Sequence, residues 1–316
     1  MNNQTREEMK KRLEYSIRMR NQPRMKRWLR HPLFSLKSAA LHRIFRYIMT
    51  GRVLKPRVKM FWGEKMYITL PPWFEFLMYG AYSNGPELRL TKFLINHLED
   101  NTIFFDLGAN LGYYSLLASN ISKNLRVFSF EPNEEIREVL EKNKRDNIQI
   151  VPEAVSNIAG HAELHYGNIV LSGVSTLNLE NTMLTEWGGK LPKRTIVKTT
   201  TLDLFCHEWS IKPDVVKIDV EGAEADVLMG AKTLLEKKGL VIIMEVWIRP
   251  FTENYRRAIE ILKKANFLCY GISEDGTLER VVYPKLKDYF SKIKRTCRTQ
   301  SKRESIVDNL VFIHKA

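Results

Sequence analysis

Short apolar runs alternate with amphipathic segments along the last two-thirds of the chain. Runs rich in β-branched and aromatic residues predict strands at 102–106, 125–130, 148–151, 214–219, 240–246, 267–272 and 306–314. Apolar residues at helical spacing predict helices near 112–121, 133–144, 201–209, 223–237 and 253–265. Strands that alternate with helices indicate an α/β fold, with a mostly parallel, seven-stranded sheet between two helical layers. The last strand lacks a helical crossover before it, so we expect it to run antiparallel.

Other segments lie outside this alternation. Residues 58–70 predict a hairpin that turns at Gly63-Glu64, and 88–98 predict a helix leading into the first strand. The aromatic-rich residues between them, 73–85, pack the N-terminal part against the core or cover a site. Extra strands are expected within 160–181 and 194–201, and residues 283–303 form a polar, basic insertion.

The turn after the first predicted strand carries the most informative pattern. It reads Asp106-Leu-Gly108-Ala-Asn110-Leu-Gly112 and precedes a predicted helix. Glycines at such a junction let a ligand approach the backbone, and the helix start offers free N–H donors. A dinucleotide fold would require Gly-x-Gly-x-x-Gly. Asn110 replaces its second glycine, which argues against a pyrophosphate and favours a cofactor with a charged amino-acid end, such as S-adenosylmethionine.

A second acid supports this cofactor. Glu131-Pro132-Asn133 follows the second predicted strand. An acid about 20 residues beyond the glycine turn can accept hydrogen bonds from ribose hydroxyls. We therefore place Glu131 and Asn133 in the cofactor site with the residues of the glycine turn. Either strand-end acid alone is equally well explained as a solvated carboxylate, but the pair with both glycines favours the cofactor site.

A third acidic segment follows the fourth predicted strand. It reads Lys217-Ile-Asp219-Val-Glu221-Gly, and Glu245 ends the fifth strand. In open α/β sheets, ligands bind beyond the carboxyl ends of the strands. We therefore expect Asp219 and Glu245 to lie close together, on the same rim as the glycine turn.

Several segments together resemble the FkbM family of S-adenosylmethionine-dependent methyltransferases. They are FFDLGANLGYYS, VFSFEPN, EAVSN, TTTLDLF and VVKIDVEGAEADVLMGA. The resemblance extends from about Ile103 to about Gly271, and the Lys-x-Asp-x-Glu-Gly-x-Glu string is its most specific part. It implies a Rossmann-like methyltransferase domain over residues 100–316 and methyl transfer to an oxygen, often a sugar hydroxyl. It also implies that Glu153 and Ala154 contact adenine.

An alcohol acceptor needs a base or a metal to remove its proton. The candidates are Asp219, Glu221 and Glu245. In one interpretation a carboxylate of this set is the general base. In another the set binds Mg²⁺, which prefers oxygen ligands. In a third, Glu221 and Glu224 cap the following helix and Lys217 pairs with Asp219, all for structural reasons. The sequence leaves all three open.

The composition indicates the cellular compartment of the protein. Three cysteines in 316 residues are far apart, with no Cys-x-x-Cys, so we expect neither a disulfide framework nor a zinc site. The first dozen residues are polar and charged, unlike a signal peptide, and no apolar run approaches about 18 residues. These features predict a cytoplasmic protein.

The net charge is concentrated at one end. Residues 1–60 contain 17 Lys and Arg but only 3 Asp and Glu, which accounts for the whole formal charge of +14. A nucleic-acid-modifying domain would spread basic residues over its core, so no nucleic-acid acceptor is expected. Residues 23–49 form a basic amphipathic pattern. We expect residues 1–57 to be a partly helical extension that docks on the domain or lies on the anionic inner membrane surface.

Together these patterns predict an O-methyltransferase that acts on a hydroxyl of a glycan or another hydroxylated metabolite. Residues 58–99, the hairpin and lead-in helix, join the extension to the catalytic domain. Two alternatives remain: a methyltransferase with a non-sugar acceptor, and a catalytically silent module that binds a partner through its N-terminal segment. The intact set of acids favours an enzyme.

Overall fold

A computed structural model describes residues 3–21, 54–70, 72–82, 85–167, 175–177, 193–249, 251–296 and 306–315. The amphipathic pattern predicted over 23–49 lies outside these residues, and so does part of the basic insertion. Within the described part of the chain, no helix is both long and apolar enough to cross a membrane.

One eight-stranded sheet forms the centre of the fold. Its strands are β3 (Ile103–Leu107), β4 (Arg126–Phe130), β5 (Ile148–Val151), β10 (Val215–Ile218), β11 (Val241–Arg249), β12 (Phe267–Ile272), β13 (Leu278–Val281) and β14 (Ile306–His314). The spatial order is β13-β12-β14-β11-β10-β3-β4-β5. All seven predicted strands are present. β14 runs antiparallel between β11 and β12, as expected. The eighth strand, β13, adds a hairpin at the edge, and its short sequence Leu-Glu-Arg-Val lacks an apolar run.

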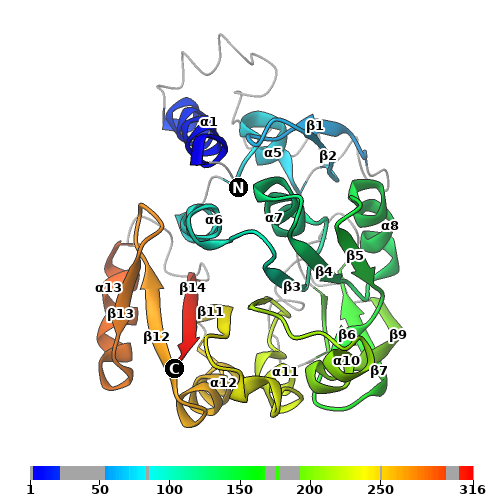
Figure 1. Cartoon of the computed structure of the whole chain (residues 1–316), viewed down its shortest axis with the longest axis vertical. Helices are drawn as coiled ribbons and strands as arrows, with labels where there is room; N and C mark the ends of the chain where they lie inside the picture. The colour runs from blue at the N-terminus through cyan, green and yellow to red at the C-terminus, as the bar shows by residue number, and fades with distance from the viewer. Residues whose placement is uncertain are drawn as a thin grey trace.

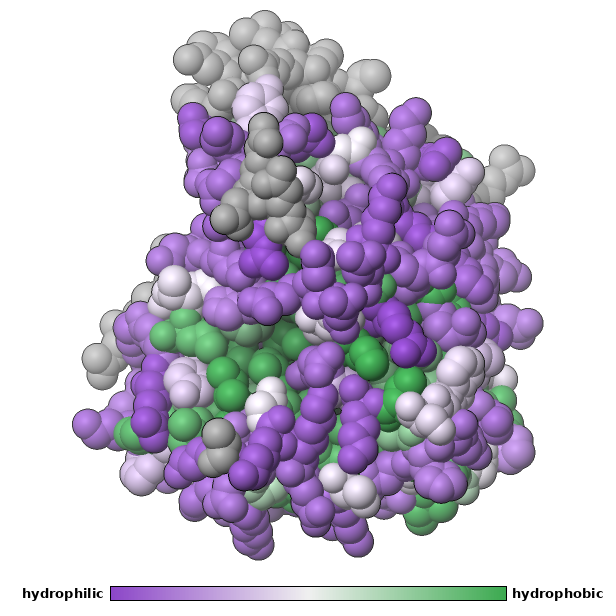
Figure 2. Space-filling view, in the orientation of Figure 1, coloured by the Kyte–Doolittle hydropathy of each residue, from purple (hydrophilic) through white to green (hydrophobic). Residues whose placement is uncertain are grey.

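Helices cover both faces of this sheet (Figure 1). On one face lie α6 (Gly85–His97), α7 (Tyr113–Ile121) and α8 (Glu134–Asn143), and on the other α10 (Leu202–Glu208), α11 (Glu224–Met229) and α12 (Glu253–Lys264). Each face has its own cluster of buried apolar residues. The view in Figure 2 is hydrophilic around its periphery, with hydrophobic residues gathered in the middle, at the level of the sheet.

The helix predicted over 223–237 is interrupted. α11 ends at Gly230, and a 3-10 turn, η2 (Leu234–Glu236), follows. A side chain at Gly230 would meet the backbone, because its Cβ would lie 2.3 Å from the carbonyl oxygen of Ser156. This close approach requires a glycine where α11 ends, in a segment whose apolar spacing alone predicts one helix.

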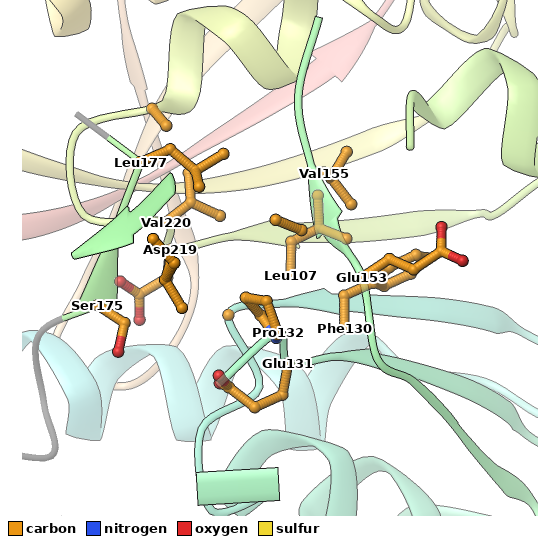
Figure 3. Close-up of a pocket in the computed structure, with 14 residues that line it drawn as sticks. Leu107, Phe130, Glu131, Pro132, Glu153, Val155, Ser175, Leu177, Asp219 and Val220 are labelled. Carbon is orange, nitrogen blue, oxygen red and sulfur yellow. The ribbon is translucent and has the colours of Figure 1, made fainter. Parts of the chain in front are cut away.

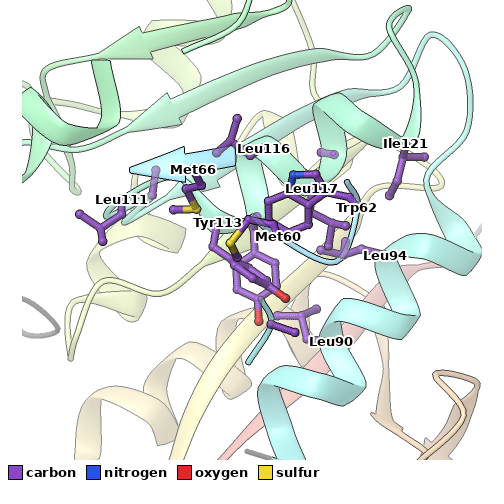
Figure 4. Close-up of a cluster of buried hydrophobic side chains, with 14 of the residues drawn as sticks. Met60, Trp62, Met66, Leu90, Leu94, Leu111, Tyr113, Leu116, Leu117 and Ile121 are labelled. Atoms are coloured by element: carbon purple, nitrogen blue, oxygen red, sulfur yellow. The ribbon is translucent and has the colours of Figure 1, made fainter. Parts of the chain in front are cut away.

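The N-terminal elements are docked on the α6–α7 face. They are α1 (Asn3–Asn21), the hairpin strands β1 (Arg57–Lys59) and β2 (Lys65–Tyr67), and α5 (Phe74–Tyr79). The hairpin turns at Gly63-Glu64 as predicted. Figure 4 shows Trp62 and Met66 of the hairpin among side chains of α6 and α7, including Leu90 and Leu117. The hairpin is therefore part of the main hydrophobic core.

α1 is held by both apolar and polar contacts. Met9 and Leu13 are buried in the same core as the hairpin. The Arg6 guanidinium donates to the carbonyl oxygens of Asn96 and Leu98 at the end of α6. The first helix of the basic extension thus packs on the domain.

A second, four-stranded sheet lies beside the main one. Its strands are β6 (Ala154–Val155), β7 (Gly160–Tyr166), β8 (Ser175–Thr176) and β9 (Lys193–Thr200), in the order β6-β9-β7-β8. The extra strands predicted in this region are confirmed. β6 follows β5 after only Pro152-Glu153, so this sheet begins at the carboxyl end of the main one.

The basic insertion before β14 contains η3 (Tyr283–Lys285) and α13 (Leu286–Thr296). Only part of α13 faces the solvent, and its aromatic side packs on the domain. Phe290 is buried, and Tyr289 lies directly over Gly271 of β12, where a Cβ would be 2.2 Å from the tyrosine oxygen. The Tyr289 hydroxyl donates to the buried Asp308 of β14 at 3.0 Å. Lys287 and Lys292 thus belong to a helix that is anchored through its aromatic side chains.

Leu13→Ala should lower the free energy of unfolding by about 2–5 kcal/mol, because it removes buried apolar contacts and leaves a cavity. Chemical denaturation measures this change. Lys11→Ala is the matched control, since Lys11 is exposed on the same helix and should shift stability by no more than about 0.5 kcal/mol. Equal stability of wild type and Leu13→Ala would show that α1 does not contribute to the fold.

Candidate functional site

The carboxyl ends of the central strands meet at a rim with two adjoining cavities. The smaller is about 50 Å³ and the larger about 280 Å³. Both are lined by Gly108, Glu131, Ser175 and Asp219, so these residues lie where the cavities join. Figure 3 shows Glu131, Ser175 and Asp219 on one side of the smaller cavity and Phe130 on the other. One elongated ligand can therefore occupy both cavities.

The glycine turn after β3 has left-handed backbone at three positions. The φ angles are 74° at Gly108, 51° at Asn110 and 90° at Gly112. At Gly108 a Cβ would lie 1.9 Å from the carbonyl oxygen of Asp219, so only glycine fits there. Asn110 tolerates this conformation, and its side-chain oxygen accepts from the N–H of Leu111 at 2.8 Å.

Gly112 has a different role in the structure. It is the residue before α7, and a Cβ there would lie 2.5 Å from Cδ1 of Leu140 on α8. It lines neither cavity. Its small size allows the start of α7 to pack closely on α8, while Gly108 and Asn110 form the cavity wall.

Glu131 directly follows β4 and is almost fully buried at the junction of the cavities. Its two carboxylate oxygens accept backbone N–H bonds from Asn110 and Asn133, each at 2.9 Å. Burial raises the pKa of Glu131 to about 7, and the two backbone N–H bonds oppose this rise. A carboxylate offers about four lone-pair sites, so each oxygen can accept a second hydrogen bond. This fits the two hydroxyls of a ribose.

The smaller cavity is a mostly apolar slot beside Glu131. Its walls include Leu107, Phe130, Val155 and Val220. Glu153 and Ala154, predicted to contact adenine, are both in its lining. The Glu153 carboxylate accepts from the Lys198 ammonium at 2.6 Å, which fixes it at the edge of the slot. An apolar slot with a carboxylate at one edge suits a purine ring that carries an amino group.

Two predicted cofactor residues lie behind the lining. Asp106 is fully buried, accepts from the Ser115 hydroxyl at 2.6 Å and lies 3.4 Å from the Lys217 ammonium. Asn133 caps α8, accepting from the N–H of Glu135 at 3.0 Å, and donates to the Ser175 hydroxyl at 3.2 Å. Neither lines a cavity, so both shape the rim through neighbouring residues.

The predicted acids after β10 and within β11 come together in the larger cavity. β11 continues to Arg249, so Glu245 lies inside this strand and not at its end as predicted. Oxygens of Asp219, Glu221 and Glu245 all lie within 4.8 Å of one another. Parallel pairing of β10 with β11 explains this, because Ile218 pairs with Met244, one residue before Asp219 and Glu245. Burial, followed by the charge of Asp219, raises the pKa values of Glu221 and Glu245 well above the usual range.

Lys217 supplies the positive charge of this cluster. Its ammonium lies 3.1 Å from the carboxylate of Asp219 and 3.4 Å from that of Asp106, and 5.2 Å from the centre of the Tyr114 ring. The side chain is buried beneath the glycine turn. One lysine thus links the acid under the cofactor turn with the acid at the junction of the cavities.

The sequence did not assign several residues that line the larger cavity to the site individually. Trp73, Glu75, Tyr82, Glu87 and Tyr114 also line it. The aromatic composition of 73–85 indicated packing or a cover, and the structure shows both. Glu87 gave no signal, because acids are common in the first turn of a helix. Burial raises its pKa to about 7, and the Tyr114 hydroxyl donates to its carboxylate.

The fold and the rim define a Rossmann-like, S-adenosylmethionine-dependent methyltransferase. The family model "Methyltransferase FkbM domain" matches residues 106–269, which is more than half of the chain. The chain belongs to this family.

A curated relative is the hexuronic acid methyltransferase AglP of Haloferax volcanii, 27% identical over 161 residues. The match covers 50% of this chain and 61% of the relative, so the chain spans about three-fifths of that protein's length.

Similar solved structures include a precorrin-6y C5,15-methyltransferase from Geobacter metallireducens, with a TM-score of 0.38 and 14% identity over 72% of this chain and 86% of the other. The FkbM methyltransferase of Methylobacillus flagellatus has a TM-score of 0.35 and 13% identity, with coverages of 57% and 42%. The fibrillarin of Aeropyrum pernix, with bound S-adenosyl-L-methionine, has a TM-score of 0.38 and 13% identity, with coverages of 71% and 73%.

Glu131→Gln should weaken S-adenosylmethionine binding by about 10- to 100-fold, because hydrogen bonds to a charged acceptor contribute about 1.5–3 kcal/mol. Titration calorimetry measures the affinity. In the wild type, the affinity should also fall as the pH drops through about 7, since protonation removes the charge of Glu131. The variant should lose this pH dependence.

Glu141→Gln is the matched control, because Glu141 is exposed on α8 and lies in neither cavity. It should bind the cofactor like the wild type, with the same pH dependence. Wild-type affinity in Glu131→Gln, with an unchanged melting temperature, would remove Glu131 from the cofactor site.

Proposed function

We propose that this chain transfers a methyl group from S-adenosylmethionine to a hydroxyl of a glycan or another hydroxylated metabolite. The observation that carries this proposal is the position of Asp219, which lines both cavities. It stands between the slot suited to a purine and a larger, polar cavity that can receive an acceptor. The likeness to a hexuronic acid methyltransferase supports a sugar acceptor.

The residues present fit the cofactor. The slot at Glu153 and Ala154 would hold adenine, Glu131 would hold the ribose, and the turn at Gly108 and Asn110 would face the rest of the molecule. Asp106, Gly112 and Asn133 would support this arrangement from behind. When bound, S-adenosylmethionine supplies a methyl group activated by a positively charged sulfur.

The protein must then align an acceptor hydroxyl and take its proton. We assign the role of base to Asp219, because it lies where the two cavities join and forms an ion pair with the Lys217 ammonium at 3.1 Å. Glu221 and Glu245 lie close enough to accept or donate hydrogen bonds around the same hydroxyl. In this arrangement Lys217 positions Asp219.

A divalent cation is the second candidate for this step. Three carboxylates within 4.8 Å of one another could hold Mg²⁺, which would acidify a bound hydroxyl. The ion pair of Asp219 with Lys217 favours the base, because a cation would have to share that carboxylate with the ammonium.

Asp219→Asn should reduce turnover by about 100-fold or more, the usual effect of removing a general base. Cofactor affinity should change little, since the amide keeps the shape of the side chain. Methyl transfer is followed by mass spectrometry, as the gain of one methyl group. Asp226→Asn, on α11 outside both cavities, is the control and should keep wild-type turnover.

A chelator separates the two mechanisms. Turnover that is insensitive to EDTA supports the base, whereas loss with EDTA and recovery with Mg²⁺ supports the metal. Full turnover in both Asp219→Asn and Glu245→Gln would refute both assignments.

We also infer that residues 1–57 form a basic extension that brings the enzyme to the anionic cytoplasmic surface of a membrane, where lipid-linked acceptors can be presented. The concentration of the net charge within residues 1–60 supports this inference. α1 packs on the domain, so the basic residues that follow it are the candidates for the surface contact. Each Lys or Arg near such a surface contributes about 1 kcal/mol, screened by salt.

Replacement of Arg24, Lys26 and Arg27 by Gln should weaken sedimentation with anionic liposomes by about 100-fold at low salt, at about 1 kcal/mol for each charge. The matched control replaces Lys285, Lys287 and Lys292, which removes the same charge from the C-terminal insertion. It should sediment like the wild type. Equal loss in both variants, or no binding of the wild-type chain, would refute the membrane contact.

A further inference from the structure

The hydroxyl of Ser175 lies at the junction of the two cavities and has no part in the mechanism above. Ser175 belongs to β8, the short strand at the edge of the second sheet, and lines both cavities, as Asp219 does. Side chains alternate along a strand, so Ser175 and Leu177 point the same way, and both line the smaller cavity. Figure 3 shows Ser175 on the side of this cavity where the Asp219 carboxylate lies.

The side chain of Asn133 determines how the Ser175 hydroxyl can be used. Its Oδ1 accepts from the N–H of Glu135 at 3.0 Å as the cap of α8, which leaves Nδ2 to face Ser175. An amide NH₂ group can only donate, and it donates to Oγ of Ser175 at 3.2 Å. A hydroxyl that accepts in this way still has its own proton to donate. Because Ser175 lines both cavities, a ligand at their junction can accept that hydrogen bond.

Ser175 and Asp219 thus offer opposite hydrogen-bonding groups at the same place. The carboxylate of Asp219 accepts, and the hydroxyl of Ser175 donates. An alcohol oxygen carries one proton and two lone pairs. It can therefore give its proton to Asp219, accept from Ser175 with one lone pair, and keep the second lone pair for the methyl carbon.

We propose that Ser175 is a further catalytic residue, which donates a hydrogen bond to the acceptor oxygen while Asp219 takes the proton of that oxygen. A bond forms between the acceptor oxygen and the methyl carbon as the bond from this carbon to sulfur breaks. The electron pair of the broken bond goes to sulfur, and the hydroxyl proton goes to Asp219. Asn133 is a positioning residue, because it acts on the acceptor through Ser175. This inference rests on the proposed function and adds a second contact to the acceptor oxygen.

Ser175→Ala removes this donor. With S-adenosylmethionine at saturation, methyl transfer to methyl glucuronide, methyl glucoside, methyl galactoside and methyl mannoside is followed by mass spectrometry. The glycoside with the highest wild-type turnover is then used for the variants. Turnover should fall about tenfold or more in Ser175→Ala, while the affinity for S-adenosylhomocysteine, measured by calorimetry, stays within about twofold.

Ser291→Ala is the matched control, because Ser291 is exposed on α13 and lies in neither cavity. It should keep wild-type turnover. Unchanged turnover in Ser175→Ala overturns the inference. Weaker S-adenosylhomocysteine binding in Ser175→Ala, with full turnover at saturation, assigns the hydroxyl to the cofactor and also overturns it.

Asn133→Asp reverses the hydrogen bond to Ser175. Aspartate caps a helix about as well as asparagine, so α8 should stay intact. Its carboxylate cannot donate and instead accepts the Ser175 proton that the wild type offers to the ligand. The substitution should lower turnover about tenfold in the wild-type background and cause no further loss in the Ser175→Ala background. Equal losses in both backgrounds would come from the added charge alone and would contradict the role of Asn133.

Binding without turnover gives an independent measurement. Ligand-observed NMR compares the chosen glycoside with its analogue that lacks the oxygen at the methylated position, both in the presence of S-adenosylhomocysteine. The wild type should prefer the parent glycoside, and Ser175→Ala should reduce this preference several-fold. An unchanged preference overturns the contact between Ser175 and the acceptor oxygen.

Failure of the inference is distinguishable from failure of the proposed function. If the wild type and Ser175→Ala transfer methyl groups equally fast, the proposed function stands and the inference falls. If the wild type methylates none of the glycosides, the assignment of a sugar hydroxyl as acceptor falls, and the inference falls with it.

Discussion

The close contact between two turns controls the geometry of the whole site. The turn after β3 touches the turn after β10 at Gly108, where a Cβ would lie 1.9 Å from the carbonyl oxygen of Asp219. The N–H of Asp219 also donates to the carbonyl oxygen of Leu107 at 3.2 Å. Because the two backbones meet, the cofactor wall and the carboxylate assigned as base form one rigid unit. Any side chain at Gly108 would separate them.

Buried charged residues beneath this contact stabilise the position of the two turns relative to each other. Lys217 is buried between Asp106 and Asp219, and the Ser115 hydroxyl donates to Asp106. Removing one partner of a buried charged network leaves an uncompensated charge, so each member depends on the others. Asp106 therefore supports the position of the turn through its contacts with Lys217 and Ser115. This explains how a residue that stands out in the sequence can be essential to the rim without lining a cavity.

The sequence predicts the sheet and the cofactor side well because both depend on local patterns. Seven strands follow from apolar runs, and Asp219 and Glu245 meet because β10 and β11 pair in parallel with Ile218 beside Met244. The features that the sequence did not predict depend on packing between distant segments. β13 has too few apolar residues to give a pattern, the glycine at the end of α11 is required by its contact with Ser156, and Glu87 reaches the rim only because α6 packs beside α7. No periodicity within a segment encodes such contacts.

The residues of the site come from two separate parts of the sequence. The cofactor wall and the acid cluster lie within residues 106–269, the range that the family model matches. Trp73, Glu75 and Glu87 line the larger cavity and precede that range. Trp73 is the residue before α5, Glu75 belongs to α5 and Glu87 belongs to α6. Membership of the family therefore accounts for methyl transfer but leaves the acceptor open. Changes before residue 106 can alter the lining of the larger cavity, while the contact between Gly108 and Asp219 stays intact.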